Sequence, residues 1–418
     1  MAIDASEGPS RPAPVADRRL ARLRRFCATL GPGLLVMIAD SDPGNVVTAA
    51  QSGATWGYRL APLLLLLIPP LYFVQELAVR VGIFTRRGFG ELVREQFGLR
   101  WAVFCAVALS LAALGTLVTA FAAVAGIGEV HGVARPAALA AAAALLVLAR
   151  LGGAYRRVER VALGIGALEA AFFVVAWQAR PDLSAMMREA VDIPWRDPQF
   201  GYLAAAIVGA SFSPWMTFYQ QAAVVARGMG PADYRLARWD TAIGAALTQL
   251  VTLAVLIAAA ATLRERVELT SVGEVVEAFA GARPHISPLI FDMGVLGAAL
   301  VAVIVASFAL TWGLTEIFGS ASARRSSHDL SIKCAFAFTV CGSAIPVGAS
   351  PDLVSLILKA QIANVFLSPV VVVLLILLAG RVVPEHLRLR GRERALVVFS
   401  SAAASAIGVA GGFFALFS

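Results

Sequence analysis

The chain has 418 residues, of which 59% are hydrophobic and 15% are charged, and its mean hydropathy is +0.78. This composition excludes an ordinary soluble domain and indicates a polytopic membrane protein embedded in a lipid bilayer. The formal net charge of +8 does not point to a nucleic-acid partner, because the basic residues lie in short clusters between apolar runs, where cytoplasmic loops are expected.

The first 26 residues are rich in Pro and Arg and lack the apolar core and cleavage site of a signal peptide. We therefore expect residues 1–26 to form a cytosolic N-terminal tail. Because a spanning helix needs about 20 apolar residues, the remainder predicts eleven transmembrane segments. They cover approximately 29–54, 59–84, 101–128, 134–152, 160–179, 200–226, 240–262, 286–318, 331–347, 352–379 and 394–416.

The distribution of Lys and Arg predicts the orientation of these segments. With the N-terminus inside, the predicted cytoplasmic segments hold 25 of the 35 Lys and Arg residues and the outer loops hold 8. An excess of these residues marks the cytoplasmic side. We therefore expect a multi-pass protein of the cell membrane with a cytoplasmic N-terminus and an extracellular C-terminus.

An odd number of segments per repeat forces two tandem repeats into opposite orientations, as in many secondary transporters. Residues 27–180 and 198–380 fit two such five-helix repeats, and residues 393–418 supply an additional eleventh helix. The expected fold class is thus an all-α membrane protein with an inverted 5+5 repeat.

Two apolar segments are interrupted at corresponding places in the two halves. The first contains Asp40-Ser41-Asp42-Pro43-Gly44-Asn45 and the sixth contains Gly209-Ala210-Ser211-Phe212-Ser213-Pro214-Trp215-Met216-Thr217. Unwound backbone and ionisable groups are tolerated at membrane depth only where they line a cavity or an aqueous site. We interpret the two interruptions as the two halves of a binding site.

The site is expected to offer oxygen atoms only. Pro cannot donate the backbone N–H that the carbonyls of Ala39 and Ala210 would otherwise receive. These carbonyls, the Asp42 carboxylate, the Asn45 amide oxygen and the Ser213 hydroxyl form a set suited to hard cations such as Mg²⁺, Mn²⁺ or Ca²⁺. Two other roles of Asp42 stay open: it caps the following helix, or it binds an ammonium group.

Three stretches of the chain resemble the Nramp family of divalent-metal transporters. They are Asp42-Pro43-Gly44-Asn45, Ala54-Thr55-Trp56-Gly57-Tyr58 and Gln75-Glu76-Leu77-Ala78-Val79-Arg80-Val81-Gly82. The resemblance implies a LeuT-like fold in which the first and sixth helices are unwound. It further implies alternating access to a midplane metal site built from those two helices. Gln361 matches the family's glutamine that joins the site in some conformations.

The chain departs from the family pattern at the positions that set metal choice and proton coupling. Nramp proteins carry Met-Pro-His in the sixth helix, where this chain has Ser213-Pro214-Trp215, and Gln220 stands at the family's second His. Thr116 and Thr119 occupy the places of two carboxylates associated with proton movement. Loss of the soft thioether and of the titratable groups resembles the Nramp-related magnesium transporter branch.

The expected function is therefore transport of Mg²⁺, with Mn²⁺ also accepted, without proton coupling and by a monomer. The metal-site residues predicted are Asp42, Asn45, Ala39, Ala210, Ser213, Gln361 and Gln220. No cofactor is expected beyond the transported ion. No enzyme is expected either, because the sequence contains no Ser/His, HExxH or Asp/Asp constellation.

Two alternatives remain. One is a proton-coupled Mn²⁺/Fe²⁺ symporter of the ordinary Nramp type, and the other is an amine or amino-acid transporter of the amino-acid–polyamine–organocation group. The role of Asp40 is open, between the outer vestibule and a solvated position. Glu76 and Arg80, one helical turn apart, are expected to form an ion pair.

Overall fold

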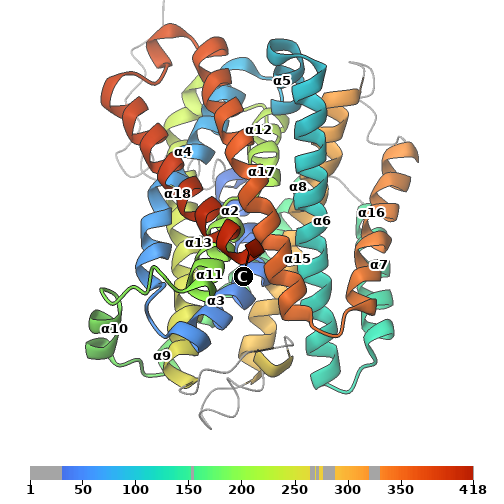
Figure 1. Cartoon of the computed structure of the whole chain (residues 1–418). Coiled ribbons are helices and arrows are strands. Elements are labelled where there is room, and N and C mark those ends of the chain that lie inside the picture. Colours follow the sequence, from blue (N-terminus) through green and yellow to red (C-terminus); the bar gives the residue numbers. More distant parts are fainter. Residues whose placement is uncertain are drawn as a thin grey trace, which may run out of the picture.

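The computed structural model describes residues 31–151, 155–263, 269, 273–275, 288–319 and 330–417. Within these ranges the chain is a bundle of helices without a strand (Figure 1). The predicted tail, residues 1–26, lies outside the described residues.

Apart from the short helices α5 and α10, which lie between predicted segments, the helices or pairs of helices coincide with the predicted apolar segments to within about six residues at either end. Their bounds are α2 Pro32–Asp40, α3 Pro43–Trp56, α4 Ala61–Thr85, α5 Phe89–Phe97, α6 Leu99–Val130, α7 Arg135–Leu151, α8 Tyr155–Gly166, α9 Ala170–Gln178, α10 Leu183–Glu189, α11 Pro198–Ser211, α12 Pro214–Ala226, α13 Tyr234–Thr262, α15 Pro288–Phe318, α16 Leu330–Ala349, α17 Leu353–Val382 and α18 Gly391–Phe417. Short 3₁₀ turns lie at Ala167–Glu169, Pro231–Asp233 and Glu385–Leu387. The limits of the two five-helix repeats stay a prediction.

Seven helices in the described part of the chain are long and apolar enough to cross a membrane. The first and sixth predicted segments fall short of this criterion because each is divided into two helices, α2 with α3 and α11 with α12. In each pair a proline begins the second helix, at Pro43 and at Pro214. Proline is well suited to a first helical position and cannot continue a preceding helix.

The interrupted helices lie in the middle of the bundle. Helix α13 packs against α2, α3 and α4, and α11 packs against α3, α17 and α18. In Figure 1, α7 and α16 stand to the right of α6, away from this centre. The polar residues of the two interruptions are therefore enclosed on all sides by other helices.

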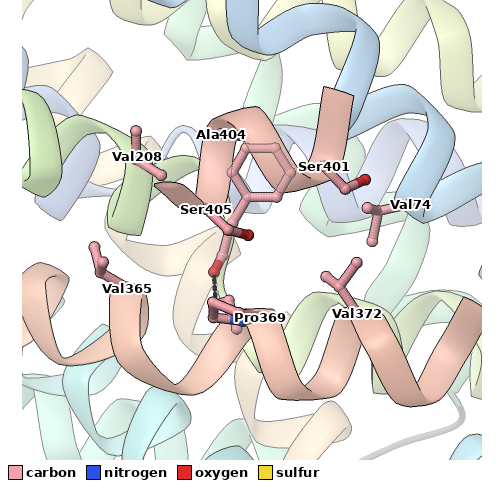
Figure 2. A pocket seen from close by; sticks show the side chains of 10 residues that line it. Val74, Val208, Val365, Pro369, Val372, Ser401, Ala404 and Ser405 are labelled. Atoms are coloured by element: carbon pink, nitrogen blue, oxygen red, sulfur yellow. Dashed lines mark hydrogen bonds between the residues drawn. The ribbon is translucent and has the colours of Figure 1, made fainter. Parts of the chain in front are cut away.

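Helix α18, which corresponds to the eleventh predicted segment, covers the break in the sixth segment. A small pocket of about 10 Å³ lies between α11, α17 and α18. Figure 2 shows Val208 and Val365 at one end of it and Val372 at the other, with Ser401 and Ser405 projecting from α18. Inside the pocket Ser368 donates a hydrogen bond to the Phe212 carbonyl, which the helix break leaves without an intrahelical partner.

The predicted pair of Glu76 and Arg80 is confirmed. Their side chains lie 3.1 Å apart, and both are almost completely buried. Arg80 also contacts Glu393 of α18 at 2.7 Å, and Tyr234 of α13 donates to Glu76. This network joins three helices at the end of the bundle predicted to face the cytoplasm.

Candidate metal centre

The second helix of each interrupted pair begins at a site residue. Asp42 and Ser213 are the N-cap residues of α3 and α12, and both have extended backbone conformations. The Asp42 carboxylate accepts a hydrogen bond of 2.9 Å from the Asn45 backbone N–H. The predicted capping role of Asp42 is thus present. It uses one carboxylate oxygen, Oδ1, and leaves capacity for other partners.

The two breaks are joined by Asn45. Its amide nitrogen donates to the Ala210 carbonyl at 3.1 Å and to the Asp40 carbonyl. Ala210 lies four residues before Pro214, so its carbonyl lacks the usual helical donor. Asn45 supplies that donor here. A cation bound to the Ala210 carbonyl would replace the hydrogen bond from Asn45.

Helix α17 contributes two more side-chain amides, those of Gln361 and Asn364, to the region between the two breaks. Asn364 donates to the Ser213 hydroxyl at 3.0 Å and to the Gln361 side-chain oxygen at 3.2 Å. Ser213 makes no capping bond to its own helix. Its hydroxyl orientation is therefore set by α17.

Two glycines let Gln361 enter between the broken helices. A Cβ atom on Gly44 would lie 1.9 Å from Gln361 Nε2, and a Cβ atom on Gly209 would lie 2.0 Å from the Gln361 carbonyl oxygen. The contact at Gly209 is with backbone, so it could be relieved only by a shift of α17 or of α11, whereas the contact at Gly44 would displace the Gln361 side chain. The structure thus brings Gln361 to both breaks, at a distance only glycine permits.

A side chain from α6 completes the surroundings of Asp42. Trp215 donates its indole N–H to the Thr116 hydroxyl at 3.0 Å. The Thr116 side chain lies close to the Asp42 carboxylate. Trp215, Thr116 and Asp42 therefore bring polar groups from three helices together.

These groups form a buried site whose oxygen atoms, apart from those of the Asp42 carboxylate, belong to uncharged groups. Asp42, Asn45, Ser213, Gln361 and Ala210 are each at most 7% exposed. Among the residues that the structure describes, no three His, Cys, Asp or Glu side chains converge on one point. The arrangement can hold a cation through one carboxylate together with amide, hydroxyl and carbonyl oxygens, a ligand set that suits hard divalent ions.

A comparison with protein families covers nearly the whole chain. Residues 33–413 match the model of the natural resistance-associated macrophage protein-like (Nramp) family. The chain belongs to the Nramp family. It is 34% identical over 257 residues to the divalent metal cation transporter MntH 1 of Pseudomonas aeruginosa. That match covers 57% of each chain, so it spans little more than half the length of this relative.

Solved structures agree with the Nramp assignment at the level of the fold. The Eremococcus coleocola manganese transporter, solved with an aromatic bis-isothiourea compound, superposes with a TM-score of 0.75 at 17% identity, covering 98% of this chain and 88% of that one. The nucleobase-cation-symport-1 transporter Mhp1 gives 0.58 at 16% identity, covering 93% and 91%. The chain therefore has the LeuT-like fold that the resemblance implied.

The other predicted residues lie around this centre without all joining it. Gln220 donates to Thr241 of α13 at 3.3 Å, and its side-chain oxygen has no partner. Thr119 bonds the Thr116 carbonyl of its own helix. A role for Gln220 or Ala39 as ligand stays a prediction. Asp40 is not solvated, because it is only 2% exposed and lies against Thr248.

Asp240 of α13 is a second functional candidate that the sequence reading missed. Its carboxylate accepts from the backbone N–H of Gly31, Gly33 and Leu34, with the shortest distance 2.8 Å at Gly33. These donors belong to the first turn of α2, whose own N-cap makes no side-chain bond. Asp240 therefore caps α2 although it lies more than 200 residues away in sequence. No local sequence pattern predicts such a long-range cap.

Glu169 was also missed, although a signal was present. A lone carboxylate inside the apolar run 160–179 marks a functional position in a membrane helix. Glu169 is 3% exposed, and it lies close to Ser41 in the gap between α2 and α3.

Proposed function

We propose that this Nramp protein transports divalent metal ions across the cell membrane by alternating access, with Mg²⁺ as its main substrate and Mn²⁺ also accepted, and without proton coupling. It would act as a monomer, with its N-terminus in the cytoplasm and its C-terminus outside. Family membership supports a transporter rather than an enzyme.

The observation that carries the proposal is the Ser213 hydroxyl at the start of α12. This hydroxyl is held by Asn364 beside Gln361 and stands where the family resemblance expects a thioether. Met216, three residues further on, is fully buried in the hydrophobic core with Leu109 and Phe218. A soft sulfur ligand is therefore replaced by a hard oxygen.

Hard, neutral oxygens suit Mg²⁺ for a further reason. This ion dehydrates reluctantly and usually keeps several waters, so it is often held by one or two carboxylates without a complete protein cage. The Asp42 carboxylate supplies the negative charge, and the amides of Asn45 and Gln361 can contact either the ion or its waters. Mn²⁺ accepts the same ligands and would also be carried.

The bond between Trp215 and Thr116 supports transport without proton coupling. The resemblance places a His at Trp215 and a carboxylate at Thr116. Here an indole N–H and a hydroxyl, neither of which titrates near neutral pH, bond to each other at 3.0 Å. The part of the pathway next to Asp42 therefore has no proton acceptor on α6 or α12 at these two positions.

A proton-coupled Mn²⁺ or Fe²⁺ symporter is the second candidate. It is favoured by the relatives, which are named as a divalent metal cation transporter and a manganese transporter. The buried carboxylates Asp40 and Glu169 beside the site would also offer groups that can carry protons.

A flux assay in proteoliposomes separates the two functions. Mg²⁺ and Mn²⁺ uptake would be measured in parallel with a pH-sensitive dye in the lumen, at several membrane potentials. We expect saturable uptake of both ions, driven by the potential, with no change in lumenal pH beyond that of empty liposomes. Uptake of Mn²⁺ alone with stoichiometric acidification would establish the symporter, and competition by amines but not by Mg²⁺ would exclude a metal substrate.

A further inference from the structure

The fifth segment also departs from a regular α-helix, near the break between α2 and α3. The fifth segment changes from α-helix to a 3₁₀ turn at Ala167–Glu169 and then continues as α9. A 3₁₀ stretch inside a helix often marks a functional hinge. The turn packs on α15, and Gly166 before it lies against Ile38 of α2.

Glu169, at the end of this turn, is directed at the gap in the first segment. Its carboxylate is close to Ser41, whose hydroxyl lies 2.9 Å from that of Thr248 of α13. The carboxylate oxygen Oε1 is buried and has no hydrogen-bond partner in the protein. An unpartnered carboxylate oxygen in a protein interior is costly, so a cation or one of its bound waters at this oxygen would stabilise Glu169.

The charges around Glu169 are all negative. It is close enough to Asp40 and Asp42 for their charges to interact, and in the described part of the chain no Lys or Arg forms a salt bridge with any of the three. All three are at most 4% exposed. Buried charges of one sign require compensation. A divalent cation at Asp42 would supply two positive charges, so it would interact favourably with Glu169 as well.

We propose that Glu169 is a second carboxylate of the cation path, which attracts the divalent ion to Asp42 and receives it, with its remaining waters, as it leaves toward the α2 side of the break. This inference rests on the proposed function and names a residue of the same pathway. The unpartnered Oε1 is the atom that would face the hydrated ion, while the packing of the 3₁₀ turn on α15 positions the backbone of Glu169.

The test compares three variants in the flux assay, together with direct Mn²⁺ binding to the purified protein. Glu169→Gln keeps the size and the acceptor oxygen but removes the charge. We expect the apparent KM and the Mn²⁺ dissociation constant to rise on the order of tenfold or more, because a charge is lost near a divalent ion in a medium of low dielectric constant. Glu169→Asp keeps the charge and should recover most of the affinity. Asp292→Asn neutralises another buried membrane carboxylate, which is paired with His131, and should leave both constants near wild type.

Other outcomes would overturn the inference. Ser41→Ala removes the hydroxyl close to Glu169 and leaves the charge, so an equal loss in Ser41→Ala and Glu169→Gln would assign Glu169 a structural role. Unchanged metal affinity in Glu169→Gln with loss of an accompanying proton flux would make it a proton carrier instead. A wild-type protein that binds and carries neither Mg²⁺ nor Mn²⁺ would refute the proposed function, and the inference would fall with it.

Discussion

Trp215 and Thr116 hydrogen-bond each other at 3.0 Å, although they lie 99 residues apart on different helices. The Nramp resemblance places a His at Trp215 and a carboxylate at Thr116. In this chain a neutral donor and a neutral acceptor are therefore bonded where the resemblance expects two titratable groups, and Thr116 lies close to Asp42.

This bond can be measured by a double-mutant cycle. Thr116→Val and Trp215→Phe each remove one partner. We expect each to destabilise the protein by about 0.5–1.5 kcal/mol and to lower metal flux severalfold, with the double variant no worse than the worse single one. Thermal unfolding and flux would be recorded for all four proteins. Strictly additive losses would show that the two side chains act independently.

Replacement of Asp42 distinguishes capping from ion binding. Asn is as good an N-cap as Asp, so Asp42→Asn should leave the melting temperature nearly unchanged, whereas Asp42→Ala should lose about 0.5–2 kcal/mol. Both variants should lose metal flux, because both lack the carboxylate. Normal Mg²⁺ flux in a well-folded Asp42→Asn protein would leave Asp42 with its capping role alone.

The hydroxyl at Ser213 should determine the metal preference. Ser213→Met introduces a soft sulfur, and we expect the ratio of Mn²⁺ to Mg²⁺ transport to rise about tenfold, since thioethers disfavour hard ions. Ser213→Ala is the control, because it removes the oxygen without adding sulfur. Competition of each ion against a fixed concentration of Mn²⁺ provides the measurement. An equal change in both variants would attribute the effect to loss of the hydroxyl.

The close approach of Gln361 makes a prediction for two glycines. Gly209→Ala places a methyl group 2.0 Å from the Gln361 carbonyl oxygen, which α17 can avoid only by moving away. Gly44→Ala places one 1.9 Å from Gln361 Nε2, so the amide has to leave the first break. We expect both to abolish flux. Gly164→Ala is the matched control, since a Cβ atom there meets no atom within 4 Å. Because Ala is also the better helix former, Gly164→Ala should be at least as stable as wild type. Full activity in Gly44→Ala would mean that Gln361 does not need to approach the first break.

The positions of the helices follow from local properties of the chain, and these were predictable. A long apolar run has to be helical in a membrane because each backbone polar group must bond within its own segment. Pro43 and Pro214 interrupt the helical hydrogen bonding because proline has no backbone N–H to donate. The two breaks could therefore be located without a structure. The capping role of Asp42 is equally local, since its partner Asn45 is three residues away.

The remaining features depend on contacts between helices that sequence spacing does not encode. Gln361 lies between Gly44 and Gly209, Asp240 caps α2, and Glu169 lies close to Ser41 only because the bundle brings five distant segments together. Composition and local pattern by themselves determined that this protein spans the membrane and where its helices break. Only the tertiary packing decided which polar side chains meet at those breaks. The partners of a side chain depend on how its helix crosses the neighbouring helices, and the periodicity of its own helix does not determine them.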